Sequence, residues 1–116
     1  MSTHQDEVLD ALDEVVEELE ETKQQSDLAL DRARHIRQLR AEGHSYREIV
    51  RTGRRPLVVE LISQMLDRLR SAGSRLRRAT ARALRRDGMS TEEIAGLFGV
   101  SRQRVSKLIN EPAPEE

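Results

Sequence analysis

Apolar residues recur at helical spacing along most of the chain, and short stretches containing glycine or proline separate the helices that they predict. The first run extends from Asp6 to about Ala41, and a second begins at Leu57 after Pro56. Two short runs follow between Thr91 and Asn110. Because apolar positions three and four residues apart form one face of a helix, this pattern predicts an all-α protein.

The first run resembles a heptad seam about four heptads long. Its apolar and small positions are Val8, Leu12, Val15, Leu19, Thr22, Ser26, Ala29, Ala33 and Ile36, and Leu9, Val16 and Leu30 widen it. A seam of this kind must be covered, so we expect an oligomerisation helix or a surface for another protein. A helix folded back on its own domain is the alternative. Crowded acids disfavour a parallel homodimer, whereas antiparallel pairing or packing against arginine-rich helices relieves the repulsion.

The second run, from Leu57 to about Ser71, has a wide apolar face. We expect it to be a core or interface element, and not a helix that contacts bases. The predicted dimer or partner contacts over both runs are Val8, Leu12, Val15, Leu19, Ile36, Leu57, Leu61 and Met65. The stretch Ser71–Ser74 is either a hinge or a weak point in one long helix.

The clearest local pattern lies between Ser90 and Asn110. Ser90 and Glu93 form a capping box, in which the hydroxyl accepts from one backbone amide and the carboxylate from another. Ile94, Leu97 and Phe98 give the first short helix an apolar face. Gly99 suits the left-handed turn that ends it. Ser101 caps the second short helix, and its apolar face consists of Val105, Leu108 and Ile109.

This stretch resembles the helix-turn-helix of bacterial regulators, recombinases and sigma-factor promoter-binding domains. That family has a small residue at the fifth position, glycine at the ninth, and apolar residues at the fourth, tenth, fifteenth and eighteenth. The matching residues here are Ala95, Gly99, Ile94, Val100, Val105 and Leu108. The resemblance covers about 20 of 116 residues and identifies no subfamily. It implies that the second helix, Ser101–Asn110, enters the major groove of DNA.

With its apolar face turned inward, that helix leaves polar, acid-free positions outward. Family practice puts base contacts near its start, and arginine and glutamine suit guanine and adenine edges. The predicted base contacts are Ser101, Arg102, Gln103 and Ser106, and the predicted phosphate contacts are Thr91, Arg104, Lys107 and Asn110. A solvated polar face in a structural module is the alternative.

The preceding segment, Ser74–Arg86, supplies more cations, with six arginines and no acid among residues 75–86. Phosphate contacts position a protein on DNA without specifying sequence. We expect such contacts from Arg75, Arg78, Arg82, Arg85 and Arg86. The alternative is that this row neutralises the acidic N-terminal helix.

An internal repeat is indicated at an offset of 45 residues, since Gly43, Ser45, Glu48 and Ile49 match Gly88, Ser90, Glu93 and Ile94. The first copy departs from the motif after Val50, where a loop with three arginines replaces the tight turn. The chain then divides as follows: 1–5 disordered, 6–42 acidic helix, 43–72 degenerate helix-turn-helix-like middle, 73–110 three-helix DNA-binding module, and 111–116 disordered.

Charge reinforces the division. Residues 1–31 contain eleven acids against Lys23, a net charge of −10, whereas residues 32–116 contain nineteen bases against ten acids, a net charge of +9. The basic part suits a polyanion, and the acidic part should face elsewhere. Arginine supplies nearly all the positive charge, which is typical of a high-GC bacterial genome.

Other chemistry finds no support. The chain has no cysteine and no phosphate-binding glycine loop, and His4, His35 and His44 are isolated, so we expect no cofactor, no metal site and no enzyme. No apolar run near 20 residues and no signal peptide appear, which favours the cytoplasm, at the nucleoid. The sequence predicts a small homodimeric transcriptional regulator that recognises a DNA sequence. A nucleoid-associated or adaptor protein, binding DNA without sequence preference and a protein partner through the acidic helix, is the alternative.

Overall fold

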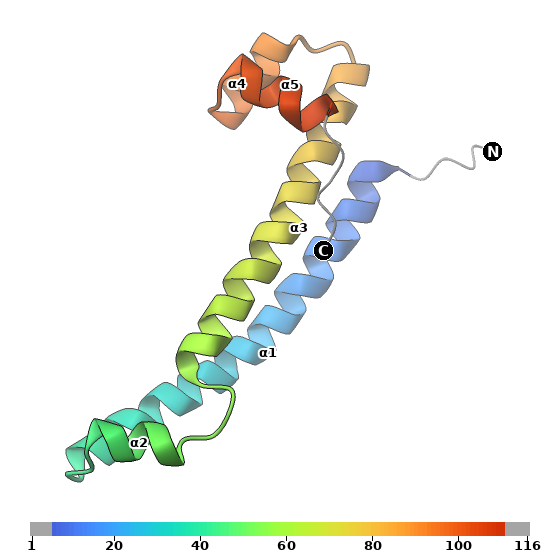
Figure 1. Ribbon diagram of the computed structural model, residues 1–116. Helices are drawn as coiled ribbons and strands as arrows, with labels where there is room; N and C mark the ends of the chain where they lie inside the picture. Colours follow the sequence, from blue (N-terminus) through green and yellow to red (C-terminus); the bar gives the residue numbers. More distant parts are fainter. Residues whose placement is uncertain (1–5, 111–116) are drawn as a thin grey trace. The chain divides into compact units, whose positions relative to one another are not determined.

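The structure is a computed structural model that describes residues 6–110. Within that range it is all-helical and contains no strand, which confirms the predicted fold class. Its five helices are shown in Figure 1: α1 (Glu7–Ala41), α2 (Tyr46–Thr52), α3 (Val58–Arg86), α4 (Thr91–Phe98) and α5 (Arg102–Asn110). The two termini expected to be disordered lie outside the described residues.

The helices contribute to two compact units. The C-terminal unit combines residues 1–16 with 70–116, and the middle unit comprises residues 17–69. The long helices α1 and α3 therefore supply residues to both units, whereas α2 belongs to the middle unit and α4 and α5 to the C-terminal unit. Each unit is built around its own antiparallel pair of segments from α1 and α3.

In the C-terminal unit, two ion pairs fix the direction of that pair. Glu7 meets Arg82 at 2.6 Å, and seven residues further along α1, Glu14 meets Arg75, seven residues earlier in α3. One heptad up one helix thus matches one heptad down the other. Ala11 is buried on α1 in the same unit, as is Ala79 on α3.

The middle unit repeats this arrangement with its own residues. The carboxylate of Glu21 lies 3.4 Å from Arg68, and four residues along α1 the side chain of Gln25 bonds that of Gln64. Leu61 is 1% exposed and is the largest fully buried side chain of this unit.

The predicted seam of α1 divides between an inner and an outer stripe. Val8, Val15 and Ile36 are half-buried within the chain, whereas Leu12 and Leu19 remain 40% and 50% exposed. The inner stripe matches the alternative in which the helix folds back on its own chain. Because the outer stripe is uncovered, it stays available to another molecule. Leu57 and Met65, also predicted as interface residues, are half-buried.

The stretch Ser71–Ser74 is helical and forms part of α3, so the interpretation as one long helix is the one observed. Ala72, in its middle, is 1% exposed and packs as a core residue. The first helix of the C-terminal module, predicted over Ser74–Arg86, is accordingly the last part of α3.

The internal repeat is visible in the hydrogen bonds that end α1 and α3. Gly43 and Gly88 both have positive φ, at +98° and +102°, which a side chain would resist. In both turns the second residue past the helix bonds a carbonyl five residues back. An arginine in the last turn also bonds the carbonyl four residues on, Arg40 to His44 and Arg85 to Met89, at 3.1 and 3.2 Å.

The repeat continues into the next helix, because a complete capping box begins both α2 and α4. The hydroxyls of Ser45 and Ser90 each accept from the amide three residues on, at 3.1 Å. Hydrogen bonds from the serine amide and hydroxyl hold the pKa of Glu48 and that of Glu93 below the usual glutamate value.

Packing of the C-terminal unit centres on Ala81, Ile94, Ala95, Val105 and Leu108, which are all buried. Phe98, Val100 and Ile109 pack at its margin, as expected. Leu97 was expected to face inward with Ile94 and Phe98, but it is 65% exposed. The buried face of α4 is centred between Ile94 and Ala95, and at 3.6 residues per turn Leu97 lies about 110° from that centre.

The two apolar residues of α4 should therefore differ strongly in their contribution to stability. We expect Ile94→Ala to lower the free energy of unfolding by about 2–5 kcal/mol, because it leaves a cavity in a fully buried site. The matched control Leu97→Ala, three residues away on the same helix, should change it by less than about 0.5 kcal/mol. Urea unfolding followed by circular dichroism measures both, and equal losses would refute the packing described.

The capping box of α4 should make stability depend on pH. The folded pKa of Glu93 lies below its unfolded value, so its contribution is complete above the usual glutamate pKa and is lost as pH falls through the lowered one. Glu93→Gln keeps an acceptor oxygen but cannot titrate. We expect the acid-induced loss of stability, measured by urea unfolding between neutral and acidic pH, to be smaller in this variant. Ser90→Ala should cost about 1 kcal/mol at neutral pH.

Candidate nucleic-acid interface

The helix α5 is anchored to the C-terminal unit by one face. Val105 and Leu108, three residues apart, are 0% and 3% exposed. Its first turn is capped by Ser101, whose hydroxyl accepts from the Arg104 amide at 3.0 Å. Gly99 has φ +68°, and this left-handed residue separates α4 from α5 as the motif requires. The two helices are therefore distinct, and α5 can orient its other face outward.

The outward face of α5 is polar and open. Arg102, Gln103 and Arg104 are exposed, and so are Ser101, Lys107 and Asn110, whereas Ser106 is half-buried. Within the described part of the chain, no hydrogen bond or ion pair engages the side chains of Arg102, Gln103, Arg104 or Lys107. These groups can thus bind a ligand without first giving up a protein partner.

Electrostatics favour an anionic ligand at this face. The sequence of α5 holds three cations and no acid. In α4 the first turn carries Glu92 and Glu93, and the second of these is engaged by Ser90. Thr91, at the start of α4, is half-buried. The arrangement can present donors to a groove and positive charge to the flanking phosphates.

Most arginines of α3 have protein partners. Arg82 bonds the carbonyl of Ile109 at 3.0 Å and the carboxylate of Glu7, so it links the end of α5 to α1 and α3. Arg75 pairs with Glu14, and Arg85 bonds the Met89 carbonyl. The expectation that this row neutralises the acidic helix therefore describes Arg75 and Arg82.

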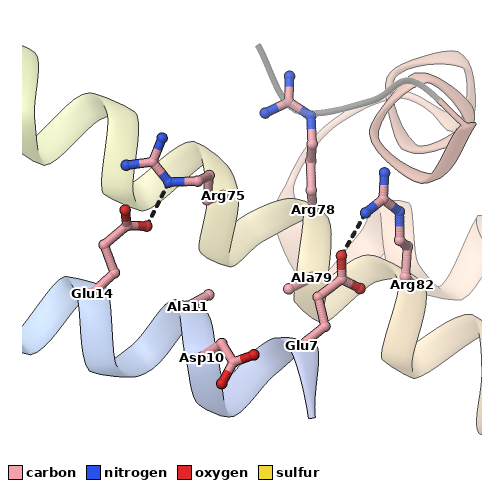
Figure 2. A pocket seen from close by; sticks show the side chains of 8 residues that line it. All are labelled: Glu7, Asp10, Ala11, Glu14, Arg75, Arg78, Ala79 and Arg82. Carbon is pink, nitrogen blue, oxygen red and sulfur yellow. Dashed lines mark hydrogen bonds and ion pairs between the residues drawn. The ribbon is translucent and has the colours of Figure 1, made fainter. Parts of the chain in front are cut away.

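Two further arginines differ. Arg86 is exposed, and Arg78 is half-buried with two of its guanidinium nitrogens lacking a hydrogen-bond partner among the described residues. Figure 2 shows Arg78 between Arg75 and Arg82, beside a cavity of about 340 Å³ between the α1 and α3 segments of the C-terminal unit. Ala11 and Ala79 supply its apolar wall.

Sequence reasoning left these specific pairs unassigned. A usable signal was present, because Glu7 and Glu14 are one heptad apart, as are Arg75 and Arg82. Opposite charges repeated at that spacing match an antiparallel pair of helices. What the spacing alone could not fix was which acid meets which arginine.

Other classes of site were also sought in residues 6–110. No group of three or more metal-ligating side chains occurs there. Nor does any helix of that range combine the length and apolar character needed to cross a membrane.

Comparison with known proteins agrees with this geometry. Residues 71–112 match the family model of a homeodomain-like domain of the helix-turn-helix class. No curated protein and no solved structure matches the chain. The matched segment covers the last part of α3 together with α4 and α5, the helices that bury Ile94, Val105 and Leu108 and expose Arg102 and Gln103. The C-terminal part of this chain is thus a homeodomain-like helix-turn-helix, a DNA-binding domain.

Proposed function

We propose that the protein is a small bacterial transcriptional regulator that recognises a specific sequence in double-stranded DNA as a homodimer. The observation that carries the proposal is the division of α5 into two faces. Val105 and Leu108 fix one face in the core, and the opposite face is exposed, basic and free of acids. A helix so anchored fits the width of the major groove and presents donors to base edges.

Base contacts come from the first turns of α5. Arg102 has the fork geometry for the guanine O6 and N7 atoms, and Gln103 can bond adenine N6 and N7. Ser101 and Ser106 add hydroxyls that suit either base. Arg104 and Lys107, which are exposed, bind the flanking phosphates, together with Thr91 and Asn110 at the ends of α4 and α5.

The arginines of α3 contribute unequally to phosphate binding. Arg78 and Arg86 can reach a phosphate without breaking an ion pair described above. Arg75, Arg82 and Arg85 must exchange a protein acceptor for a phosphate, which reduces their net contribution. If about six phosphates are neutralised per complex, the logarithm of affinity should fall with the logarithm of salt concentration at a slope near −5.

A homodimer doubles the DNA contacts and sets the spacing of two half-sites. The exposed positions of α1, among them Leu12 and Leu19, offer the surface for self-association. Such a protein acts by binding, without catalysis or a cofactor, in the cytoplasm at the nucleoid.

A second function is favoured by the same α1 surface. Leu9 and Val16 are 58% and 53% exposed among many acids, which would suit a foreign protein. In that case the molecule is an adaptor or nucleoid-associated protein, whose basic domain binds DNA of any sequence.

Selection of bound sequences from random duplex DNA tests recognition by α5. We expect an enriched motif for the full-length chain. Arg102→Ala should lower discrimination at one base position by about 1–3 kcal/mol, because a bidentate contact to one base is lost. The matched control Arg104→Ala, exposed on the same helix, should weaken binding to all sequences alike.

An unchanged motif with Arg102→Ala would remove this residue from the recognition surface. Salt-sensitive binding with no enriched motif would instead support the second function. Both results can be obtained whatever the oligomeric state of the protein.

A further inference from the structure

A groove of about 580 Å³ opens in the middle unit, between the last turns of α1, the helix α2 and the start of α3. Its apolar lining includes Ile36, Leu39, Ile49 and Val50, together with Leu57 and Val58. Although Ile49 is buried at its base, Val50 is 60% exposed at its edge. The volume lies in the range of ligand-binding pockets, which is roughly 300–1,000 Å³.

The internal repeat indicates what kind of group fills such a place. At the offset of 45 residues, the groove residues Ile36, Leu39, Ile49 and Val50 correspond to Ala81, Leu84, Ile94 and Ala95. Those four form or border the core of the C-terminal unit. The groove therefore has the position of a helix-turn-helix core.

The two copies differ in what closes that core. In the C-terminal unit it is closed by α5 through Val105 and Leu108, which are apolar and three residues apart. The corresponding residues of the middle unit are Glu60 and Ser63, and the Glu60 carboxylate accepts from the Leu57 amide at 2.7 Å. Neither polar side chain can cover an apolar surface, so the groove remains open where the second copy is filled by a helix.

The polar residues of the groove define the charge of its occupant. They include Arg32, His35 and Arg54 against the single acid Asp31. Arg32 donates to the Pro56 carbonyl, but no ion pair involves His35 or Arg54 among residues 6–110. A helix that carries acids beside its apolar face would therefore complement the rim.

The chain itself contains a segment with this chemistry. Leu9, Leu12 and Val16 form an outer stripe on α1 and are 58%, 40% and 53% exposed. Their steps of three and four residues repeat the spacing of Val105 and Leu108. Exposed acids accompany the stripe, namely Asp10, Asp13 and Glu17.

The occupant must come from another molecule. The stripe and one wall of the groove both belong to α1, which is continuous from Glu7 to Ala41, and one stretch of a helix cannot pack onto another stretch of the same helix. The geometry points to a docking site for a second copy of this chain: the outer stripe at Leu9, Leu12 and Val16 of one protomer enters the groove at Val50 of its partner. This inference deepens the proposed homodimer and rests on it.

Engineered disulfides test the contact cleanly, because the natural chain has no cysteine. Full-length Leu12→Cys and Val50→Cys chains, one of them lengthened by a tag, are mixed under mild oxidation. Since docking raises the local thiol concentration to the millimolar range, we expect the mixed disulfide to form at least about tenfold faster than in the control. The control mixes Leu12→Cys with Ile62→Cys, because Ile62 is 45% exposed in the same unit but does not line the groove.

Sedimentation equilibrium supplies the second measurement. Val50→Lys should raise the dimer Kd at least about tenfold, whereas Ile62→Lys should leave it unchanged. Circular dichroism verifies that both variants keep their helices, and the exposed positions make this the expected result.

The outcomes separate this inference from the proposed function. A dimer that shows equal disulfide rates in both mixtures, or faster pairing of Val50→Cys with itself, overturns the groove contact and keeps the dimer. A monomer at all concentrations overturns both. Sequence recognition by α5 is tested independently by the DNA selection.

Discussion

The contact of Val105 and Leu108 with Ile94 is the interaction on which the DNA-binding part of the molecule depends. All three side chains are nearly inaccessible to solvent, and they join two helices of only eight and nine residues. Helices this short are not stable alone in water, so burial of one face supplies their stability. That burial also fixes the rotation of α5, because residues 102, 103 and 104 can face outward only while 105 and 108 face inward.

Charge explains how an acidic segment and a basic segment coexist in one small chain. In the C-terminal unit, Glu7 and Glu14 pair with two of the arginines that precede the helix-turn-helix. These pairs orient α1 and remove positive charge from the middle of α3. The positive charge without a protein partner is thereby concentrated on α5, where it is most useful for binding DNA. In the middle unit, Glu21 and Arg68 form a similar pair, which shows that antiparallel pairing of α1 and α3 has the same chemical basis in both units.

The sequence predicted the local structure well, because local structure depends on neighbouring residues. The capping boxes at Ser45 and Ser90, the glycine turn at Gly99 and the helix-turn-helix follow from fixed short spacings. Contacts between distant segments were harder to predict. The apolar positions of α1 allow two registers, and only packing against α3 decides that Ala11 is buried while Leu12 is exposed. Leu97 illustrates the same limit, since three apolar residues in α4 define a face only when the partner helix has chosen its centre.

Duplication gives the two units related parts with different tasks. After the shared turn and capping box, a left-handed Gly99 leads directly into α5, whereas Gly53 is extended and leads through a longer loop into α3. The C-terminal copy closes its core and exposes a polar helix, and the middle copy keeps an apolar groove. The central claim is that the exposed face of α5 lies in the major groove. Methylation interference on a selected binding site tests it most directly, because guanine N7 is exposed only in that groove. The account predicts that methylation of N7 at one or two guanines per half-site abolishes binding. Binding that tolerates methylation at every guanine and responds only to phosphate ethylation would contradict it.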